Sequence, residues 1–547
     1  MPNQGSGGQG LAGAAGRLGV VVAAALLSSA LCPPGAGAQP APAAASAAGR
    51  TAATQRQEAS VEARSVTVRA VDKTVLAGTV YEPAGPGPHP LVVIPGAWFS
   101  LPLDDVAQAR RMRALAASGY VVVSYDPRGF RRSGGQVDLA GPADSSDLSR
   151  VIDWALAHTR SDAGRVGALG SSYGAGIALN AAAHDQRVRA VVALSGWADL
   201  SGGYFINGTR AASIALFQDL IGRFHGRYSP TVETALTRAR THGLDQADPW
   251  VRMRSPRAHV ERLNRNRTAV FMAGEWDDPL VPAGQTGAFL DELSGPKQLQ
   301  MSPGGHGDSH SGQAGPLGGQ APVWEQAVAW LDSHVRERGR HFQQPSPLVL
   351  TPRTGGPAEH YPSWSSLQHH AQPVPLSPGP GAGRLVAGLP SAAESGLYPV
   401  AGTLDRAGLP ATTLLPLLGS PAAAVWQGGH LAHASALRGA ITVQGALVSG
   451  AADGTVICYL YDVGPLGKAT LLAHAPYTFR GQAPGRAHLF SFAVPATAWD
   501  IAAGHRLAVV FDTVDHRYAG ESPIGTPVTI VPSSVRLSAP FAPVRGR

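Results

Sequence analysis

Residues 61–340 alternate between short, continuous apolar runs and longer stretches in which apolar residues recur at helical spacing. A continuous apolar run is typical of a strand covered on both faces. Such runs occupy residues 91–94, 120–125, 165–169, 188–194 and 268–274. Between them, residues 106–117 form a helical stretch, and residues 144–155 place apolar side chains on one helical face. The alternation predicts an α/β domain with a mostly parallel, doubly wound sheet, whose ligand sites lie at the carboxyl ends of the strands.

Two other patterns flank and interrupt this domain. Residues 66–70 and 75–81 alternate between apolar and polar positions around a turn, which predicts two strands at the start. Residues 200–265 break the alternation with an Arg-rich segment, in which 211–221 and 232–241 have a helical character. We interpret this segment as a helical cap inserted over the sheet. A strand at 297–301 and a helix at 323–336 complete the domain, which we place at residues 61–340.

From about residue 345 the helical periodicity disappears, and Pro and Gly become frequent. Short alternating runs follow at residues 440–448, 455–462, 488–494 and 505–512. This pattern predicts a separate all-β sandwich domain over residues 345–547.

The N-terminal segment has the pattern of a targeting sequence. Its first 38 residues hold one charge, Arg17, then an apolar run over residues 18–31 and the small-residue cleavage pattern Ala36-Gly37-Ala38. We expect a secretory signal peptide over residues 1–38 and an Ala-, Pro- and Gln-rich linker over residues 39–60. Arg is abundant and Lys scarce, as in a GC-rich bacterium, so we expect a secreted or periplasmic bacterial protein.

Composition narrows the classes of partner. The chain of 547 residues has a net charge of +7, but its arginines are scattered and form no basic face, so nucleic-acid binding is not expected. No stretch after the leader approaches the ~20 apolar residues of a membrane span. Cleavage after residue 38 leaves a single cysteine, Cys458, which excludes an internal disulfide in the mature chain.

A strand-turn-helix pattern surrounds Gly170-Ser171-Ser172-Tyr173-Gly174. The run before it predicts a buried strand, and the small residues 175–180 after it predict a helix. In this setting G-x-S-x-G is a nucleophile elbow, in which the serine occupies a strained turn and the glycines let strand and helix pass closely. Only Ser172 fits the frame, because Ser171 would need a glycine where Leu169 stands.

A nucleophilic serine needs a histidine base, and the histidine needs a carboxylate that fixes its tautomer. In this architecture the chain order is Ser, acid, His. The histidine candidate is His306, in the loop Gly304-Gly305-His306-Gly307 directly after the last strand, with His310 as the rival choice.

The acid is expected in the loop Glu275-Trp276-Asp277-Asp278-Pro279-Leu280-Val281-Pro282. Counting back from Val281-Pro282 selects Asp278, which we favour, whereas counting forward from Gly274 selects Asp277. Asp199, after the strand that follows the elbow, is a third possibility, and its ordinary role would be a helix cap.

The tetrahedral intermediate of acyl transfer needs two backbone donors. We expect one from Tyr173, the residue after the nucleophile, and the other from Ala97, in the loop after the run 91–94. Trp98 and Trp197 lie beside these loops. They either line an apolar pocket or serve only to pack the core.

Taken together, these motifs resemble an α/β-hydrolase throughout residues 61–340. The quoted segments are Ile94-Pro95-Gly96-Ala97, Asp126-Pro127-Arg128-Gly129, the elbow, Asp278-Pro279-Leu280-Val281-Pro282 and Gly305-His306-Gly307. With the cap and the C-terminal segments Tyr459-Leu460-Tyr461-Asp462-Val463-Gly464-Pro465-Leu466-Gly467 and Ala503-Gly504-His505-Arg506-Leu507, the chain is similar to the X-Pro dipeptidyl-peptidase/cocaine-esterase group.

The resemblance implies an α/β-hydrolase joined to a jelly-roll domain, and hydrolysis of an ester or amide without metal or cofactor. Family members that act on peptides or α-amino esters need an acidic group for the substrate ammonium. The cap offers Asp219, Glu233 and Asp245, whose positions the sequence does not place. Some members form part of the oxyanion hole with a tyrosine hydroxyl, but Ala97 and Trp98 follow Gly96 here, which favours backbone donors.

The leading hypothesis is a secreted serine hydrolase, an esterase or a dipeptidyl-peptidase, that forms an acyl-enzyme at Ser172. Its expected partner is a small ester or a short peptide. The alternative is a catalytically silent protein whose β-domain binds a carbohydrate or a cell surface on a hydrolase scaffold. The sequence leaves open the substrate, the oligomeric state and the role of the β-domain.

Overall fold

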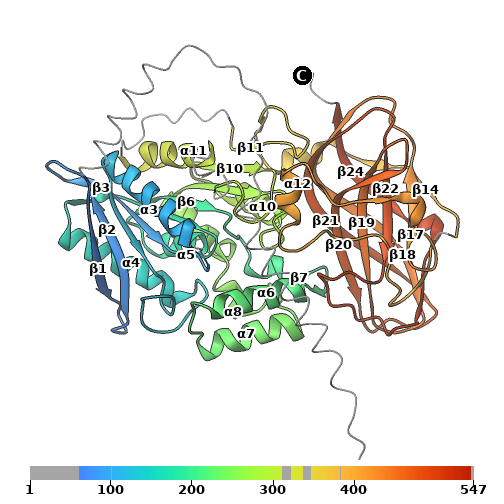
Figure 1. Cartoon of the computed structure of the whole chain (residues 1–547), viewed down its shortest axis with the longest axis horizontal. Helices are drawn as coiled ribbons and strands as arrows, with labels where there is room; N and C mark the ends of the chain where they lie inside the picture. Colours follow the sequence, from blue (N-terminus) through green and yellow to red (C-terminus); the bar gives the residue numbers. More distant parts are fainter. Residues whose placement is uncertain (1–60, 100–101, 311–321, 337–345, 382, 544–547) are drawn as a thin grey trace, which may run out of the picture.

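The computed structural model describes residues 61–99, 102–310, 322–336, 346–381 and 383–543 (Figure 1). Its N-terminal domain is built on a ten-stranded sheet with the order β1-β2-β4-β3-β5-β6-β9-β10-β11-β12. The strands are β1 (Glu62–Arg69), β2 (Val75–Glu82), β3 (His89–Pro95), β4 (Val121–Tyr125), β5 (Ser161–Ser171), β6 (Val188–Leu194), β9 (Ala269–Glu275), β10 (Lys297–Ser302), β11 (Leu348–Leu350) and β12 (Glu359–Tyr361). Neighbours from β4 to β11 are parallel, which confirms the predicted doubly wound sheet.

Helices cover both faces of this sheet. They are α3 (Pro102–Ala117), α4 (Pro142–His158), α5 (Tyr173–His184), α9 (Val260–Asn266), α10 (Ala283–Glu292) and α11 (Pro322–Leu331). The apolar sides of α4, α5, α9 and α10 form one core with the sheet, which includes Ile152, Ile177 and Phe289. On the other face, α3 and α11 contribute Met112 and Trp330 to a second core. Because the central strands are buried on both sides, their sequences are continuous apolar runs.

The cap stands between β6 and β9. It comprises a 3-10 turn (Leu200–Gly203), the hairpin β7 (Phe205–Ile206) and β8 (Thr209–Arg210), α6 (Ala212–Arg223), α7 (Pro230–Thr241), α8 (Pro249–Arg252) and a second 3-10 turn (Pro256–His259). Figure 1 shows α6, α7 and α8 grouped together in green below the sheet. The two predicted helical stretches correspond to α6 and α7.

The C-terminal domain contains two sheets with antiparallel neighbours, drawn in orange and red in Figure 1. One sheet contains β13 (Ala371–Val374), β24 (Arg536–Pro543), β18 (Ser435–Ser449), β23 (Pro527–Ile530), β15 (Arg384–Val386) and β21 (Ala487–Ile501). The other contains β14 (Leu376–Pro378), β17 (Ala424–Gly428), β22 (Arg506–Asp512), β19 (Gly454–Val463), β20 (Lys468–Phe479) and β16 (Thr412–Leu414). Buried side chains such as Trp426, Ile441 and Phe511 fill the core of this sandwich.

The structure differs from the sequence analysis at the junction of the domains. Strands β11 and β12 follow residue 345 but extend the N-terminal sheet, with Leu348 paired to Leu299 of β10. A short helix, α12 (Ala401–Arg406), also stands in the segment predicted to be all-β. These elements have three to six residues, too few to show a period in the sequence.

The expected signal peptide and linker, residues 1–60, lie outside the described residues. Within the ranges that the structure describes, no helix is long and apolar enough to cross a membrane.

Candidate active site

The elbow serine occupies a backbone conformation that its glycine neighbours make accessible. Ser172 lies between the end of β5 and the start of α5 with φ +52° and ψ −113°. A Cβ on Gly170 would stand 2.2 Å from the Gly174 carbonyl carbon, and a Cβ on Gly174 would stand 2.3 Å from the Pro95 carbonyl oxygen. Only glycine therefore allows the strand, the turn and the neighbouring β3 loop to approach this closely.

Three loops at the carboxyl ends of β5, β9 and β10 bring Ser172, Asp278 and His306 together. His306 Nε2 lies 2.8 Å from Ser172 Oγ, and His306 Nδ1 lies 2.7 Å from Asp278 Oδ2. Asp278 is buried, and its Oδ1 accepts backbone hydrogen bonds from Leu280 and Val281 at 2.8 and 3.0 Å. Since Asp278 accepts from Nδ1–H, Nε2 is left to accept the serine proton.

The electrostatics of His306 suit a base. Burial by itself lowers the pKa of His306, but the charge of Asp278 and its hydrogen bond outweigh burial and raise that pKa above its ordinary value of 6.5. The carboxylate therefore stabilises the imidazolium that proton transfer from Ser172 would create.

The two other candidate acids have different partners. Asp277 Oδ2 lies 3.1 Å from Nε of Arg353, and burial raises the pKa of Asp277 to about 7. Asp199 accepts hydrogen bonds from the backbone and side chain of Ser201, at 2.9 and 2.7 Å, as a cap of the turn that follows. Of the three, Asp278 is the one in contact with His306.

A second set of serine, histidine and acid lies buried beside the first. His310 Nε2 is 2.6 Å from Ser171 Oγ, while Ser195 Oγ donates to Glu275 at 2.8 Å and lies 3.4 Å from His310 Nδ1. Ser309 also donates to Glu275 through its amide, at 3.1 Å, and through its hydroxyl. Sequence reasoning did not single out Glu275 or Ser195, because nothing but tertiary contact gives them a role.

Ser195, Glu275 and His310 of this second set are withdrawn from solvent, whereas Ser171 is partly exposed. Ser195 and Glu275 are fully buried and His310 is 5% exposed. Burial, followed by the charge of Asp278, raises the pKa of Glu275 to about 7, whereas burial lowers the pKa of His310 to about 3. Hydrogen bonds within this set therefore connect the ends of β5, β6 and β9 to the loop that carries His306.

The expected oxyanion donors stand on either side of the elbow. Tyr173 is the first residue of α5, where a backbone N–H has no acceptor within the helix. Ala97 follows β3, whose Pro95 carbonyl packs on Gly174. The Tyr173 hydroxyl donates to Asp144 Oδ2 at 2.6 Å, so it is engaged away from the hole.

Trp98 and Trp197 both take part in packing. Trp98 packs edge-on against Phe130 and Tyr173, and its Nε1 donates to the Gln218 carbonyl of the cap at 3.1 Å. Trp197 lies against Gly176, and its Nε1 donates to the Arg254 carbonyl at 2.9 Å.

The acidic residues of the cap are already engaged. Asp219 forms ion pairs with Arg223, at 2.9 Å, and with Arg240. Glu233 pairs with Arg223 at 2.7 Å, and Asp245 accepts from the Ala247 amide at 2.8 Å. A substrate ammonium would have to displace an arginine from Asp219 or Glu233.

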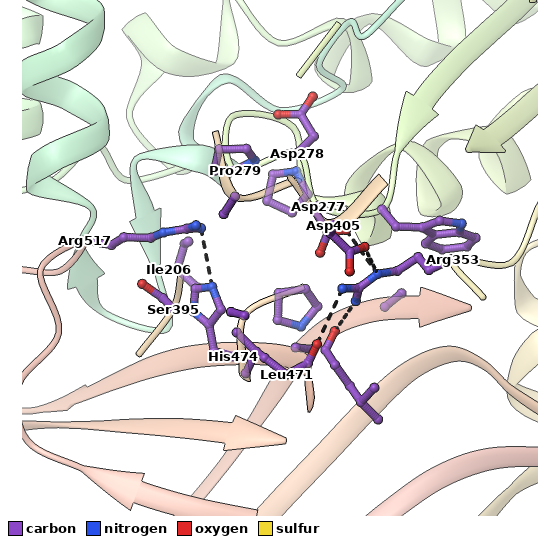
Figure 2. Close-up of a pocket in the computed structure, with 18 of the residues that line it drawn as sticks. Ile206, Asp277, Asp278, Pro279, Arg353, Ser395, Asp405, Leu471, His474 and Arg517 are labelled. Carbon is purple, nitrogen blue, oxygen red and sulfur yellow. Dashed lines mark hydrogen bonds and ion pairs between the residues drawn. The ribbon is translucent and has the colours of Figure 1, made fainter. Parts of the chain in front are cut away.

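A cavity of about 80 Å³ is lined in part by Asp278, where the two domains and the cap meet (Figure 2). Figure 2 shows Asp277, Asp278 and Pro279 above it, with Ile206 and Arg517 on one side and Asp405 and Arg353 on the other. Arg353 Nε lies 2.9 Å from Asp405 Oδ2, and Arg517 lies 3.4 Å from His474. Within the described ranges, no group of three or more His, Cys, Asp or Glu side chains is arranged to hold a metal ion.

Comparison with known families identifies the scaffold around this geometry. Residues 72–308 match the model of the X-Pro dipeptidyl-peptidase (S15) family, and residues 341–540 match that of the X-Pro dipeptidyl-peptidase C-terminal non-catalytic domain. The chain belongs to the S15 family. These two matches confirm the family resemblance seen in the sequence.

Solved structures of similar architecture cover both domains. An aminopeptidase from a marine sediment Thaumarchaeota archaeon is 15% identical, covers 88% of this chain and 96% of its own, and has a TM-score of 0.66. An α-amino acid ester hydrolase is 16% identical, with coverages of 88% and 97% and a TM-score of 0.65. A CocE/NonD family hydrolase from Staphylococcus aureus is 12% identical, with coverages of 88% and 94% and a TM-score of 0.65. These likenesses show the fold.

The curated relatives are matched over shorter stretches. An uncharacterized 31.7 kDa protein of Escherichia coli is 32% identical over 125 residues, which are 23% of this chain and 43% of that protein. The chain thus spans less than half the length of the curated relatives that it matches first.

Proposed function

We propose that this S15 hydrolase cleaves its substrate through an acyl-enzyme on Ser172. The observation that carries the proposal is the continuous hydrogen-bond chain from Ser172 Oγ through His306 to Asp278, at 2.8 and 2.7 Å. His306 takes the hydroxyl proton as Oγ attacks the substrate carbonyl, and the imidazolium then protonates the leaving group. In the second half, His306 removes a proton from water, which attacks the acyl carbon. The imidazolium then returns this proton to Ser172 Oγ as the acyl–oxygen bond breaks and the acid leaves.

The charge that develops on the carbonyl oxygen needs donors that are fixed before the reaction. We assign the backbone amides of Tyr173 and Ala97 to this role. Their position at the start of α5 and directly after β3 supports the assignment, and the positive end of the α5 dipole adds to it.

For the substrate we favour a carboxylic ester that lacks an α-ammonium group. The ion pairs of Asp219 and Glu233 support this choice, since an ammonium would compete with an arginine at either carboxylate. The third cap candidate, Asp245, accepts the Ala247 amide. The second candidate is release of a dipeptide from an X-Pro peptide, which the family match favours.

The two candidates are separated by offering p-nitrophenyl acetate and Ala-Pro-p-nitroanilide to the purified protein and its Ser172→Ala variant. We expect turnover of the ester and its loss in the variant. Preference for the anilide would select the dipeptidyl-peptidase, and undiminished turnover by Ser172→Ala would refute the acyl-enzyme at this residue.

We further propose that the protein is exported, to the periplasm or the medium, after cleavage near residue 38. The single charge and apolar run of residues 1–38 support this proposal. N-terminal sequencing of the protein from a bacterial culture tests this proposal. We expect a mature chain that starts near residue 39. A chain that is found in the cytoplasm and still begins at residue 1 would contradict it.

A further inference from the structure

The short helix α12 belongs to the C-terminal domain by sequence but packs on the active-site loops. In Figure 1 it lies on the side of the sandwich that faces β10 and α10. A Cβ on Gly402 of α12 would stand 2.5 Å from the Gly305 amide nitrogen and 2.9 Å from Asp277 Cβ. The helix backbone therefore touches both the residue before His306 and the residue before Asp278.

Side chains of α12 reach the histidine loop through Asp308. Thr403 Oγ1 donates to Asp308 Oδ2 at 2.9 Å, and the same carboxylate oxygen accepts from the Gly305 amide at 2.8 Å. Arg406 donates to the Asp308 carbonyl. Asp308 is thus held from the C-terminal domain, and it in turn holds the backbone directly before His306.

The acid loop is held through Arg353, as Figure 2 shows. Arg353 Nε lies 2.9 Å from Asp405 of α12 and 3.1 Å from Asp277. The guanidinium also donates to the carbonyls of Leu471 and Leu472 in β20. Because Arg353 is 4% exposed, this joint between α12, the sandwich and the acid loop is largely withdrawn from water.

We propose that α12 is a positioning element of the active site, in which Thr403 and Asp405 set the distance between the loops that carry His306 and Asp278. This proposal rests on the proposed function, in which His306 is the base and Asp278 its acid partner. It gives the C-terminal domain a part in the reaction that involves no contact with substrate.

Loss of the Thr403 hydroxyl should act on turnover more than on binding. Asp308 would keep the Gly305 amide and the Arg406 contact at its carbonyl, but its carboxylate would lose its tie to α12. The His306 ring would therefore sample a wider range of positions against Ser172. Misplacement by about 1 Å costs on the order of 100-fold in rate, so we expect Thr403→Val to lower kcat by about 10- to 100-fold, with KM within about twofold.

The test is steady-state kinetics of the full-length protein on p-nitrophenyl acetate, with circular dichroism and thermal melting of each variant. Thr403→Ser keeps the hydroxyl and should restore kcat, and Asp405→Asn should lower kcat with KM little changed. Thr412→Val, at an exposed position of β16, is the matched control and should behave as wild type.

The outcomes separate this inference from the proposed function. A wild-type protein that labels with a fluorophosphonate and turns over ester, beside a Thr403→Val variant with reduced kcat that Thr403→Ser restores, supports the inference. Unchanged kcat in Thr403→Val and Asp405→Asn, or a loss of activity that merely follows the loss of folded protein, would overturn it. If the fluorophosphonate does not label the wild-type protein, this result would instead contradict the role of Ser172 as nucleophile.

Discussion

His306 and His310 stand four residues apart and carry opposite pKa shifts. The pKa of His306 is raised because its partner Asp278 outweighs burial, whereas burial lowers the pKa of His310 to about 3. Glu275, the acid nearest His310, has a pKa raised to about 7 by burial and by the charge of Asp278. A base must be stabilised when it takes up a proton, and of the two only His306 has an arrangement that provides this.

Asp278→Asn should impair both the rate and its pH dependence. The wild-type base is active when neutral, so kcat/KM should fall as the pH drops through the raised pKa of His306, above 6.5. Asparagine removes the charge that raises this pKa and leaves burial, which lowers it, so the acidic limb should move to lower pH. We expect kcat to fall by about 10³- to 10⁴-fold, since the imidazole loses its tautomer and its counter-charge.

Rates on p-nitrophenyl acetate between pH 5 and 9 provide the measurement. Asp199→Asn is the matched control, because Asp199 caps a turn and should leave the limb in place. An acidic limb that does not move in Asp278→Asn would show that another carboxylate sets the pKa of the base.

At the scale of elements, the elbow depends on close backbone approach. Gly170→Ala places a Cβ 2.2 Å from the Gly174 backbone, which cannot yield without moving α5. Overpacking of this kind costs about 1–3 kcal/mol. We expect a lower melting temperature together with loss of activity, because the shift displaces Ser172.

Gly284→Ala is the matched control. This glycine lies in α10, and a Cβ there would meet no described atom within 4 Å. Alanine in a helix is favoured over glycine by about 0.5–1 kcal/mol, so the control should melt at or above the wild-type temperature. Equal melting temperatures and activities of Gly170→Ala and wild type would contradict the close approach.

Local sequence patterns predicted most helices and strands, and they selected Ser172, His306 and Asp278, which the structure brings into contact. Continuous apolar runs predicted the central strands, and the strand-turn-helix around Ser172 predicted the elbow. The loop count that favoured Asp278 has a structural reason, since this carboxylate accepts the amides of Leu280 and Val281. These signals lie within a few residues of the atoms concerned.

The parts that the sequence did not reveal depend on distant segments. Arg353 contacts both Asp277 and Asp405, which lie 76 positions before it and 52 positions after it in the chain (353 − 277 and 405 − 353). Strands β11 and β12 have three residues each; β11 joins the first sheet by pairing with β10, and β12 pairs with β11. No periodicity in a single sequence encodes such contacts, so the sheet membership of β11 and β12 and the contacts of α12 could not be predicted.

At the scale of the whole molecule, buried ion clusters fasten the sandwich to the first sheet. Arg438 of β18 contacts Glu359 of β12 at 2.8 Å and Asp500 of β21 at 2.5 Å, and its side chain is 4% exposed. One cation therefore holds two carboxylates that belong to different sheets. The junction relies on this charge balance as well as on apolar packing.

Arg438→Ala should loosen this junction. The variant removes the cation that both Glu359 and Asp500 contact, which for largely buried groups costs up to about 3 kcal/mol. We expect a lower melting temperature in calorimetry, and partial recovery when Glu359→Gln is added. A melting temperature equal to that of wild type would show that the ion cluster contributes little to the junction.

The role of Ser172 as nucleophile is tested most directly by mapping a covalent adduct. The full-length protein is treated with a fluorophosphonate, digested, and analysed by mass spectrometry, beside its Ser172→Ala and Ser195→Ala variants. The geometry predicts an adduct on Ser172, its absence from Ser172→Ala and its retention in Ser195→Ala. An adduct on Ser171 or Ser195, or undiminished labelling of Ser172→Ala, would contradict the assignment of the catalytic serine.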